Sequence, residues 1–371
     1  MKQSLVARER LYNMDLLRIV SMFFIVALHV IGRGGILKAN PLFTVKSISI
    51  VLLEPYVFCG VNCFAMLSGY VRSGQKHRFS GIVSLWLQVF LYSAGITLVA
   101  KLATNSFANI KLLPSLFPVL SGQYWYFCCY LPVFLLAPLF NAAMDKLSLH
   151  QLGKLLLITG LGLTLGTFYK DVFICSNGYS PLWLGYLYLL GGFFRRLENP
   201  GKPAKWALLH IGSNLLISVA YLVLWYFDRS EGSDLLHYNS PLLLFSSVTL
   251  FGFFVTLKVK NTAAIKLIGF FSPLTFGVYL IHTHPVVFSI IEKRFAFLGK
   301  YPLPVMLLGI MGITLGIFLV CALVDWLRLW VFRLLKLKKL LQKPEPALEG
   351  AVDTLVIRLL PKSQCGSGQD A

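Results

Sequence analysis

Long apolar runs recur along the whole sequence, and they restrict the fold more than any other feature. One helical crossing of a bilayer needs about 20 predominantly apolar residues. The 371-residue chain has ten such segments, which are residues 14–32, 55–71, 80–101, 122–142, 151–169, 181–197, 205–227, 240–258, 266–284 and 302–331. Because 57% of the residues are hydrophobic and only 13% are charged, a soluble domain is excluded. The sequence predicts an all-α, polytopic integral-membrane bundle of about ten transmembrane helices.

Lysine and arginine are distributed unevenly between the two sides that these segments define. Of 34 such residues, 24 fall in the two terminal segments and in every second loop, and cytosolic loops are the ones enriched in basic residues. This bias predicts that both termini are cytosolic and that the protein is multi-pass in the cell (cytoplasmic or inner) membrane. The net charge of +19 then reflects orientation and contact with anionic membrane lipids, and not binding to nucleic acid.

One membrane domain accounts for most of the chain. We expect residues 1–335 to form it, and residues 336–371 to be a basic juxtamembrane segment, KLKKLLQKPEP, followed by a disordered cytosolic tail. The seven cysteines follow no disulfide pattern, and no group of ligand-type residues has the spacing of a metal site. The sequence therefore predicts neither a metal nor a bound cofactor.

The first apolar run carries three ionisable residues on one helical face. Asp15 and Arg18 are three residues apart, and Arg18 and His29 are eleven apart. Helical geometry places all three on one side and separates Arg18 from His29 by roughly 16 Å. Ionisable side chains within a membrane usually face a protein interior or a wet cavity. The alternative is that Asp15 and Arg18 only anchor the helix at the interface while His29 packs, but the shared face favours a functional site.

A second polar group closes the second span on the same, cytosolic side. Ser68 can donate a hydrogen bond, Gly69 permits a close backbone approach, and Arg72 adds a cation at the depth of Arg18. Because arginine binds phosphate bidentately, Arg18 and Arg72 are candidates to hold an anionic substrate. We expect Asp15 to fix the side chain of Arg18 without touching the substrate.

The remaining candidates lie at the depth of His29, towards the outer face. Trp125 and Tyr126 open the fourth span, and Tyr279 and His282 close the ninth. Aromatic residues at this depth are also typical of an interfacial belt. Histidine is not, so two spans that carry histidine at the same depth indicate a site.

The chemistry of His29 suits a general base. An imidazole has an ordinary pKa of about 6.5 and can take a proton from a hydroxyl when a neighbour orients it. No carboxylate lies one helical turn from His29, so its partner must come from another span. The available candidates on the second span are Glu54 and Asn62.

Four motifs resemble those of the type-3 membrane acyltransferase family. In order along the chain they are MDLLRIVSMFFIVALHV, GVNCFAMLSGYV, QYWYF and FGVYLIHTHP. The first is the most specific, because it holds the family's Arg-x10-His arrangement as Arg18 and His29. The third departs from the family's usual Leu-Trp-Tyr-Leu, although Trp125 is intact.

The resemblance implies a function. Members of this family O-acetylate surface polysaccharides and related glycans, usually from acetyl-CoA, and the arginine and histidine of their first span are thought essential. We therefore expect an O-acyltransferase with catalytic His29, Arg18 and Asp15. The resemblance implies acyl-CoA as co-substrate and a glycan or lipid-linked saccharide as acceptor. The alternative is a transporter or flippase for a glycan or small polar metabolite, although no inverted repeat is evident.

Overall fold

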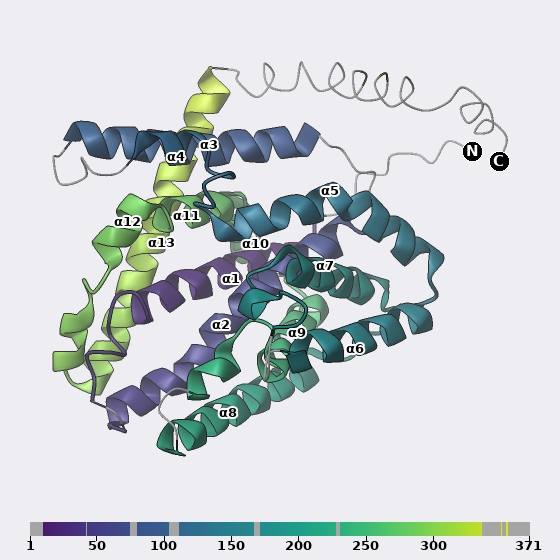
Figure 1. Ribbon diagram of the computed structural model, residues 1–371, viewed down its shortest axis with the longest axis horizontal. Helices are drawn as coiled ribbons and strands as arrows, with labels where there is room; N and C mark the ends of the chain where they lie inside the picture. Colours follow the sequence, from purple (N-terminus) through teal and green to yellow (C-terminus); the bar gives the residue numbers. More distant parts are fainter. Residues whose placement is uncertain are drawn as a thin grey trace.

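The computed structural model describes residues 10–41, 43–74, 80–103, 111–166, 171–227, 231–335, 350 and 354. Apart from loops, this part of the chain is helical throughout (Figure 1). The helices are α1 Tyr12–Ile31, α2 Val45–Arg72, α3 Ser80–Ala103, α4 Leu112–Leu116, α5 Trp125–Lys146, α6 Leu149–Leu165, α7 Pro181–Arg196, α8 Pro203–Phe227, α9 Pro241–Thr256, α10 Thr262–Phe271, α11 Thr275–His282, α12 Pro285–Ile291 and α13 Leu303–Leu334. The expected juxtamembrane segment and tail lie almost wholly outside the described residues.

The predicted all-α membrane bundle is confirmed. Among the described residues, eight helical segments are long and apolar enough to cross a membrane. Helices α6 and α7 account for the other two predicted segments, but they have only 17 and 16 residues. At 1.5 Å per residue each spans about 25 Å, which is short for a hydrocarbon core of about 30 Å.

Helix α2 runs through the middle of the bundle and packs against α1, α7, α8 and α9 (Figure 1). It begins at Val45, ten residues before the predicted apolar segment 55–71. Thr44 and Ser47 form a capping box that satisfies free N–H groups at this end. The helix continues through Pro55, which a membrane helix tolerates when its neighbours cover the break.

The ninth predicted span is broken. Helices α10 and α11 are joined by a 3-10 turn, Ser272–Leu274. Pro273 lacks the N–H that a continuous α-helix needs and its ring displaces the preceding turn. The predicted segment 266–284 corresponds to the candidate membrane span Thr262–His282, and the break within it brings the Ser272 hydroxyl to α1.

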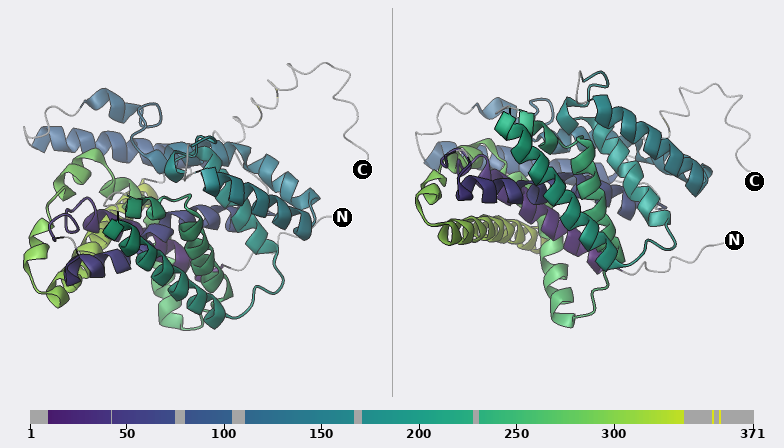
Figure 2. Two further views of the ribbon diagram at one scale, coloured as in Figure 1. Left: turned by 60° about the horizontal axis from the view of Figure 1, so that its bottom comes forward. Right: turned by 90° about the horizontal axis from the view of Figure 1, so that it is seen from below.

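Glycines allow α2 and α7 to approach closely. A Cβ on Gly69 would lie 1.8 Å from the carbonyl oxygen of Tyr188, and one on Gly191 would lie 1.9 Å from that of Met66. Such contacts are typical of membrane helices, in which small residues let backbones meet. On the other flank, α13 lies beside α1 and α11, as the yellow-green helix in Figure 2 shows.

Candidate active site

The polar residues near the start of α1 form one hydrogen-bonded group. Nη1 of Arg18 donates to Oδ1 of Asp15 at 3.0 Å and to Oγ of Ser272 at 3.1 Å. Ser272 in turn donates to Asp15 at 2.7 Å, and Arg10 forms a second ion pair with this carboxylate. The network holds the Arg18 guanidinium in one place, as expected for Asp15, and the broken ninth span completes it.

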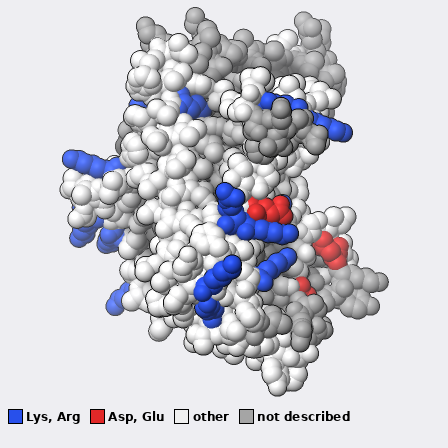
Figure 3. Space-filling view, turned by 90° about the vertical axis from the view of Figure 1, so that its left-hand side faces the viewer, with Lys and Arg blue, Asp and Glu red and all other residues white. Residues whose placement is uncertain are grey.

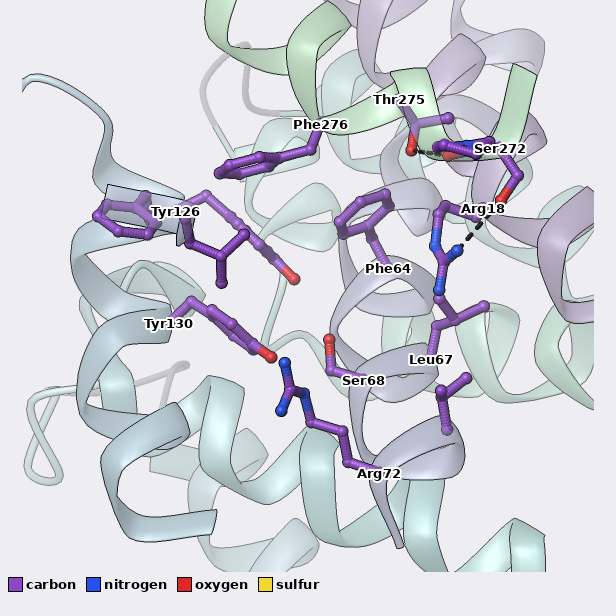
Figure 4. A pocket seen from close by; sticks show the side chains of 14 residues that line it. Arg18, Phe64, Leu67, Ser68, Arg72, Tyr126, Tyr130, Ser272, Thr275 and Phe276 are labelled. Atoms are coloured by element: carbon purple, nitrogen blue, oxygen red, sulfur yellow. Dashed lines mark hydrogen bonds between the residues drawn. The ribbon is translucent and has the colours of Figure 1, made fainter. Parts of the chain in front are cut away.

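Arg18 borders a cavity of about 390 Å³ near this end of the bundle (Figure 4). Its lining is mixed polar and aromatic, and comprises Arg18, Phe64, Leu67, Ser68, Val71, Arg72, Leu85, Tyr126, Phe127, Tyr130, Ser272, Pro273, Thr275 and Phe276. In Figure 4 the Tyr130 hydroxyl points towards the Arg72 guanidinium, the Ser68 hydroxyl lies beside them, and Arg18 lies across the cavity next to Ser272. We call this space the inner cavity.

The structure brings most of the predicted donor-binding residues together. Arg18, Ser68 and Arg72 all line the inner cavity. Gly69 does not, because it faces the Tyr188 backbone on α7. Tyr130 also lines the cavity, and the sequence analysis missed it. Its place one helical turn after Tyr126, on the same face of α5, was the available signal.

His29, at the other end of the same α1 face, contacts His282. Nδ1 of His29 lies 3.1 Å from Nε2 of His282, and Nδ1 of His282 lies 2.6 Å from the carbonyl oxygen of Val278. A carbonyl can only accept, so the Nδ1 of His282 carries a proton. In the neutral ring Nε2 is then an acceptor, and His29 must donate from Nδ1. The Nε2 lone pair of His29 is left free to take a proton.

Both rings are expected to be neutral. His282 is fully buried, and none of the described carboxylates bonds to either ring. A buried, unpaired charge would be costly. The pair therefore fixes one tautomer, which is the condition a histidine needs to act as a base.

The predicted orienting partners of His29 are wrong. Asn62 donates to the Tyr238 carbonyl at 2.8 Å and to Ser247, and it accepts from the Trp183 indole. Glu54 is buried and its Oε2 bonds to none of the described residues. The His29 partner is His282, which arrives from a helix far along the sequence.

A second cavity, of about 440 Å³, adjoins His29, and we call it the outer cavity. It is lined by His29, Arg33, Gln123, Trp125, Tyr179, Tyr279, Thr283, Pro285, Phe288, Ser289 and Glu292. Trp125 and Tyr279 thus lie where the sequence placed them, beside His29. Gln123, the first residue of the QYWYF motif, joins them. Tyr179 and Phe288 also line the cavity, and the sequence alone gave no reason to assign these two to the site.

Tyr126 and Tyr279 lie between the two cavities. Tyr126 lines the inner cavity and Tyr279 lines the outer one, and their ring centroids are 6.0 Å apart in an edge-to-face arrangement. Both hydroxyls are buried, and neither bonds to any residue that the structure describes. Buried hydroxyls are normally paired, so these two are unusual and could donate to a ligand.

His284 has a structural position. Its Nδ1 accepts from the Val286 N–H at 3.2 Å and caps α12, while its Nε2 lies 3.1 Å from the Ser93 carbonyl. Burial lowers the pKa of His284 to about 4. Of the two neighbouring histidines, only His282 belongs to the site. Within the described ranges, no three His, Cys, Asp or Glu residues form a group that could hold a metal ion.

Comparison with known proteins identifies the family. A family model described as an acyltransferase domain matches residues 11–326, which include both cavities. No curated protein and no solved structure matches significantly. The match favours the acyltransferase over the transporter. The chain belongs to the type-3 acyltransferase family and is an integral-membrane acyltransferase.

Proposed function

We propose that the protein transfers an acetyl or other short acyl group from acyl-CoA to a hydroxyl of a cell-surface polysaccharide or lipid-linked glycan. One observation carries the proposal. The two cavities border the same face of α1, with cationic Arg18 and Arg72 in one and the His29 base in the other. A molecule with an anionic end and a distant reactive end fits this division.

Acetyl-CoA is such a molecule. Its phosphates need cationic partners to enter a membrane protein, and Arg18 and Arg72 can supply bidentate hydrogen bonds. The pantetheine arm is thin and extended. Its reach is comparable to the roughly 16 Å of helix rise between Arg18 and His29. In this scheme the donor phosphates occupy the inner cavity, and the thioester passes Tyr126 and Tyr279 to reach His29.

The transfer step follows from the tautomer of His29. The acceptor hydroxyl loses its proton to Nε2 of His29 as its oxygen attacks the thioester carbonyl. A C–O bond forms, the C–S bond breaks, and the departing thiolate takes the proton back from the imidazolium. His282 accepts from Nδ1 throughout and stabilises the transient positive charge.

The unpaired tyrosine hydroxyls could stabilise the negative charge that develops during this reaction. Negative charge develops on the thioester oxygen in the transition state, and preorganised donors at that point contribute strongly to catalysis. In the proposed scheme the Tyr279 hydroxyl donates to this oxygen, and Tyr126 guides the arm. Both groups already lie on the route between the cavities.

The proposed setting is the cytoplasmic membrane, with both termini in the cytosol. The distribution of lysine and arginine supports this orientation. The inner cavity then opens towards the cytosol, where acetyl-CoA is made. The outer cavity faces the side on which surface glycans are assembled.

Donor binding and turnover test the proposal separately. We would measure acetyl-CoA affinity by calorimetry on detergent-purified variants, and CoA release with a glycan acceptor. Arg18→Ala is expected to weaken donor binding at least about tenfold, because it removes a charge-assisted contact. His29→Ala is expected to leave that affinity nearly intact while turnover falls by about 10²–10⁴.

Arg333→Ala serves as the matched control, since Arg333 lies in the last turn of α13 and lines neither cavity. It should bind acetyl-CoA as the unaltered protein does. The proposal is wrong if Arg18→Ala binds the donor normally, or if both site variants lose donor affinity equally.

A further inference from the structure

Two loops pair at the mouth of the outer cavity. The N–H of Lys293 donates to the Arg33 carbonyl at 2.9 Å, and the N–H of Phe295 donates to that of Gly34 at 3.0 Å. The loop after α1 and the loop after α12 are thereby fixed to each other. We call residues 33–46 and 292–300 together the outer rim.

The outer rim is strongly cationic. Its basic residues are Arg33, Lys38, Lys46, Lys293, Arg294 and Lys300, against one carboxylate, Glu292. Figure 3 looks onto the face where α12 lies and shows lysine and arginine side chains outnumbering acidic ones. In the proposed orientation this excess opposes the usual depletion of basic residues on the outer side. The rim charges therefore call for a reason other than membrane topology.

Arg33 connects the rim to the reaction centre. It lines the outer cavity, and its guanidinium lies over the Phe288 ring, 4.9 Å from the centroid. Phe288 in turn contacts the His29 ring edge-to-face at 4.9 Å. Arg33 also pairs with Glu292 at 3.6 Å, but both side chains are about half exposed (48% and 45%). Exposed pairs of this kind contribute little, so an anionic ligand can compete for Arg33.

Lys293 occupies a backbone conformation that favours glycine. Its φ is +56°, in the left-handed region that costs an ordinary residue roughly 1–2 kcal/mol. The pairing with Arg33 holds it there. Lys293 directly follows Glu292, which lines the outer cavity, so this strained residue lies next to the cavity wall, and strain at such a position suggests a functional role.

The cavity wall suits a sugar ring. Trp125 and Tyr179 have ring centroids 4.4 Å apart, and both line the outer cavity. Gln123 lines it too, and its amide nitrogen is buried without a partner among the described residues. Apolar ring faces and a free amide donor are complementary to the C–H face and the hydroxyls of a saccharide.

We propose that the outer cavity binds an acidic saccharide, with its anionic substituent at Arg33 and Lys293 and one of its hydroxyls at His29. This assignment rests on the proposed function and narrows its acceptor. The rim cations attract the anion and fix the orientation of the sugar. The aromatic wall and Gln123 hold the ring, and the hydroxyl next to His29 becomes the one that is acylated.

The test compares two probes with the same sugars, one of them charged and the other neutral. Trigalacturonate carries a carboxylate on each sugar, and its methyl ester is neutral. Binding of each to the detergent-purified full-length protein would be measured by calorimetry, at low and at high salt. We expect the acid to bind at least about tenfold more tightly at low salt, and the difference to shrink at high salt because screening weakens exposed charge contacts.

Three variants test which basic residues cause the difference in affinity between the acid and the ester. Arg33→Gln should lower the affinity for the acid about tenfold and leave that for the ester unchanged. Lys293→Gly should lower it about threefold to tenfold while preserving the fold, since glycine is the residue best suited to this φ. Lys111→Gln removes a cation outside the outer rim and should change neither affinity.

Failure of this inference is distinguishable from failure of the proposed function, because the assay requires no acyl transfer. Equal binding of acid and ester, or equal losses in Arg33→Gln and Lys111→Gln, would overturn the acidic-saccharide assignment. The rim cations would then serve another anion, such as lipid headgroups. Acetyl-CoA affinity and turnover of the same preparations report on the proposed function separately.

Discussion

Nδ1 of His29 and Nε2 of His282 lie 3.1 Å apart, and the Val278 carbonyl decides which of them carries the proton. In the proposed mechanism this relationship makes His282 the positioning residue and His29 the residue that transfers the proton. The two histidines come from helices that are far apart in the sequence, α1 and α11.

The first prediction concerns this pair. His282→Phe should reduce kcat at least about tenfold, because His29 loses the acceptor that fixes its tautomer, while acetyl-CoA affinity is kept. His282→Gln, whose amide oxygen can accept the same hydrogen bond, should recover part of the rate. His150→Phe on the exposed start of α6 is the control. An unchanged kcat in His282→Phe would contradict the positioning role.

The second prediction concerns the Tyr279 hydroxyl. Tyr279→Phe should lower kcat by about 10²-fold, the cost of losing one oxyanion donor. The same change should leave the protein as stable or stabilise it by about 1 kcal/mol, because a buried, unpaired hydroxyl is removed. Turnover assays and thermal unfolding in detergent would check both. A parallel loss of rate and stability would indicate a packing role instead, and Tyr301→Phe at an exposed position is the control.

The third prediction separates packing from binding at Gly69. Gly69→Ala should destabilise the protein by about 1–3 kcal/mol, because its Cβ would overlap the Tyr188 carbonyl on α7. Gly95→Ala on α3 meets nothing within 4 Å. It should be neutral or stabilising by up to about 1 kcal/mol. Thermal unfolding measures the difference, and normal stability of Gly69→Ala with weakened acetyl-CoA binding would restore Gly69 to the donor site.

The fourth prediction concerns acid stability. In the fold, burial lowers the pKa of His284 to about 4, whereas the unfolded residue titrates at about 6.5. The unfolded state therefore binds this proton first as the pH falls, so stability should decrease between about pH 6.5 and pH 4. His284→Asn can still cap α12 and should flatten the pH dependence in this window. The same pH profile in the variant would show that His284 is not responsible.

The fifth prediction tests the orientation. Single cysteines at Lys154 and Lys202, in a cysteine-free background, should be shielded from an impermeant thiol reagent in intact cells. Cysteines at Lys111 and Lys300 should react. Labelling of the first pair would reverse the proposed sidedness, and the outer rim would then face the cytosol.

Periodicity along α1 was enough to predict its polar face. The 3.6-residue repeat placed Asp15, Arg18 and His29 on one face of the helix. In the structure, Arg18 on this face lines the inner cavity and His29 lines the outer one. The ten apolar segments could also be recognised in the sequence, because the length of a membrane span follows from bilayer thickness. These features depend on local spacing alone.

Features that depend on contacts between helices could not be predicted from the sequence. The His29 partner required the position of α11 relative to α1, which no local pattern encodes. The start of α2 was misplaced because Pro55 resembles the first residue of a helix, although Thr44 and Ser47 offered a capping signal. Pro273 was a visible signal for the break that brings Ser272 to Arg18.

The tyrosine pair between the cavities has a consequence for the cell that is independent of catalysis. Tyr126 lines the inner cavity and Tyr279 the outer one, and their rings pack against each other between the two spaces. In the proposed scheme an acyl group passes between the cavities, so the same passage must stay closed to protons and ions driven by their electrochemical gradients. Two packed aromatic rings that part for a thin pantetheine arm and close behind it would meet both demands.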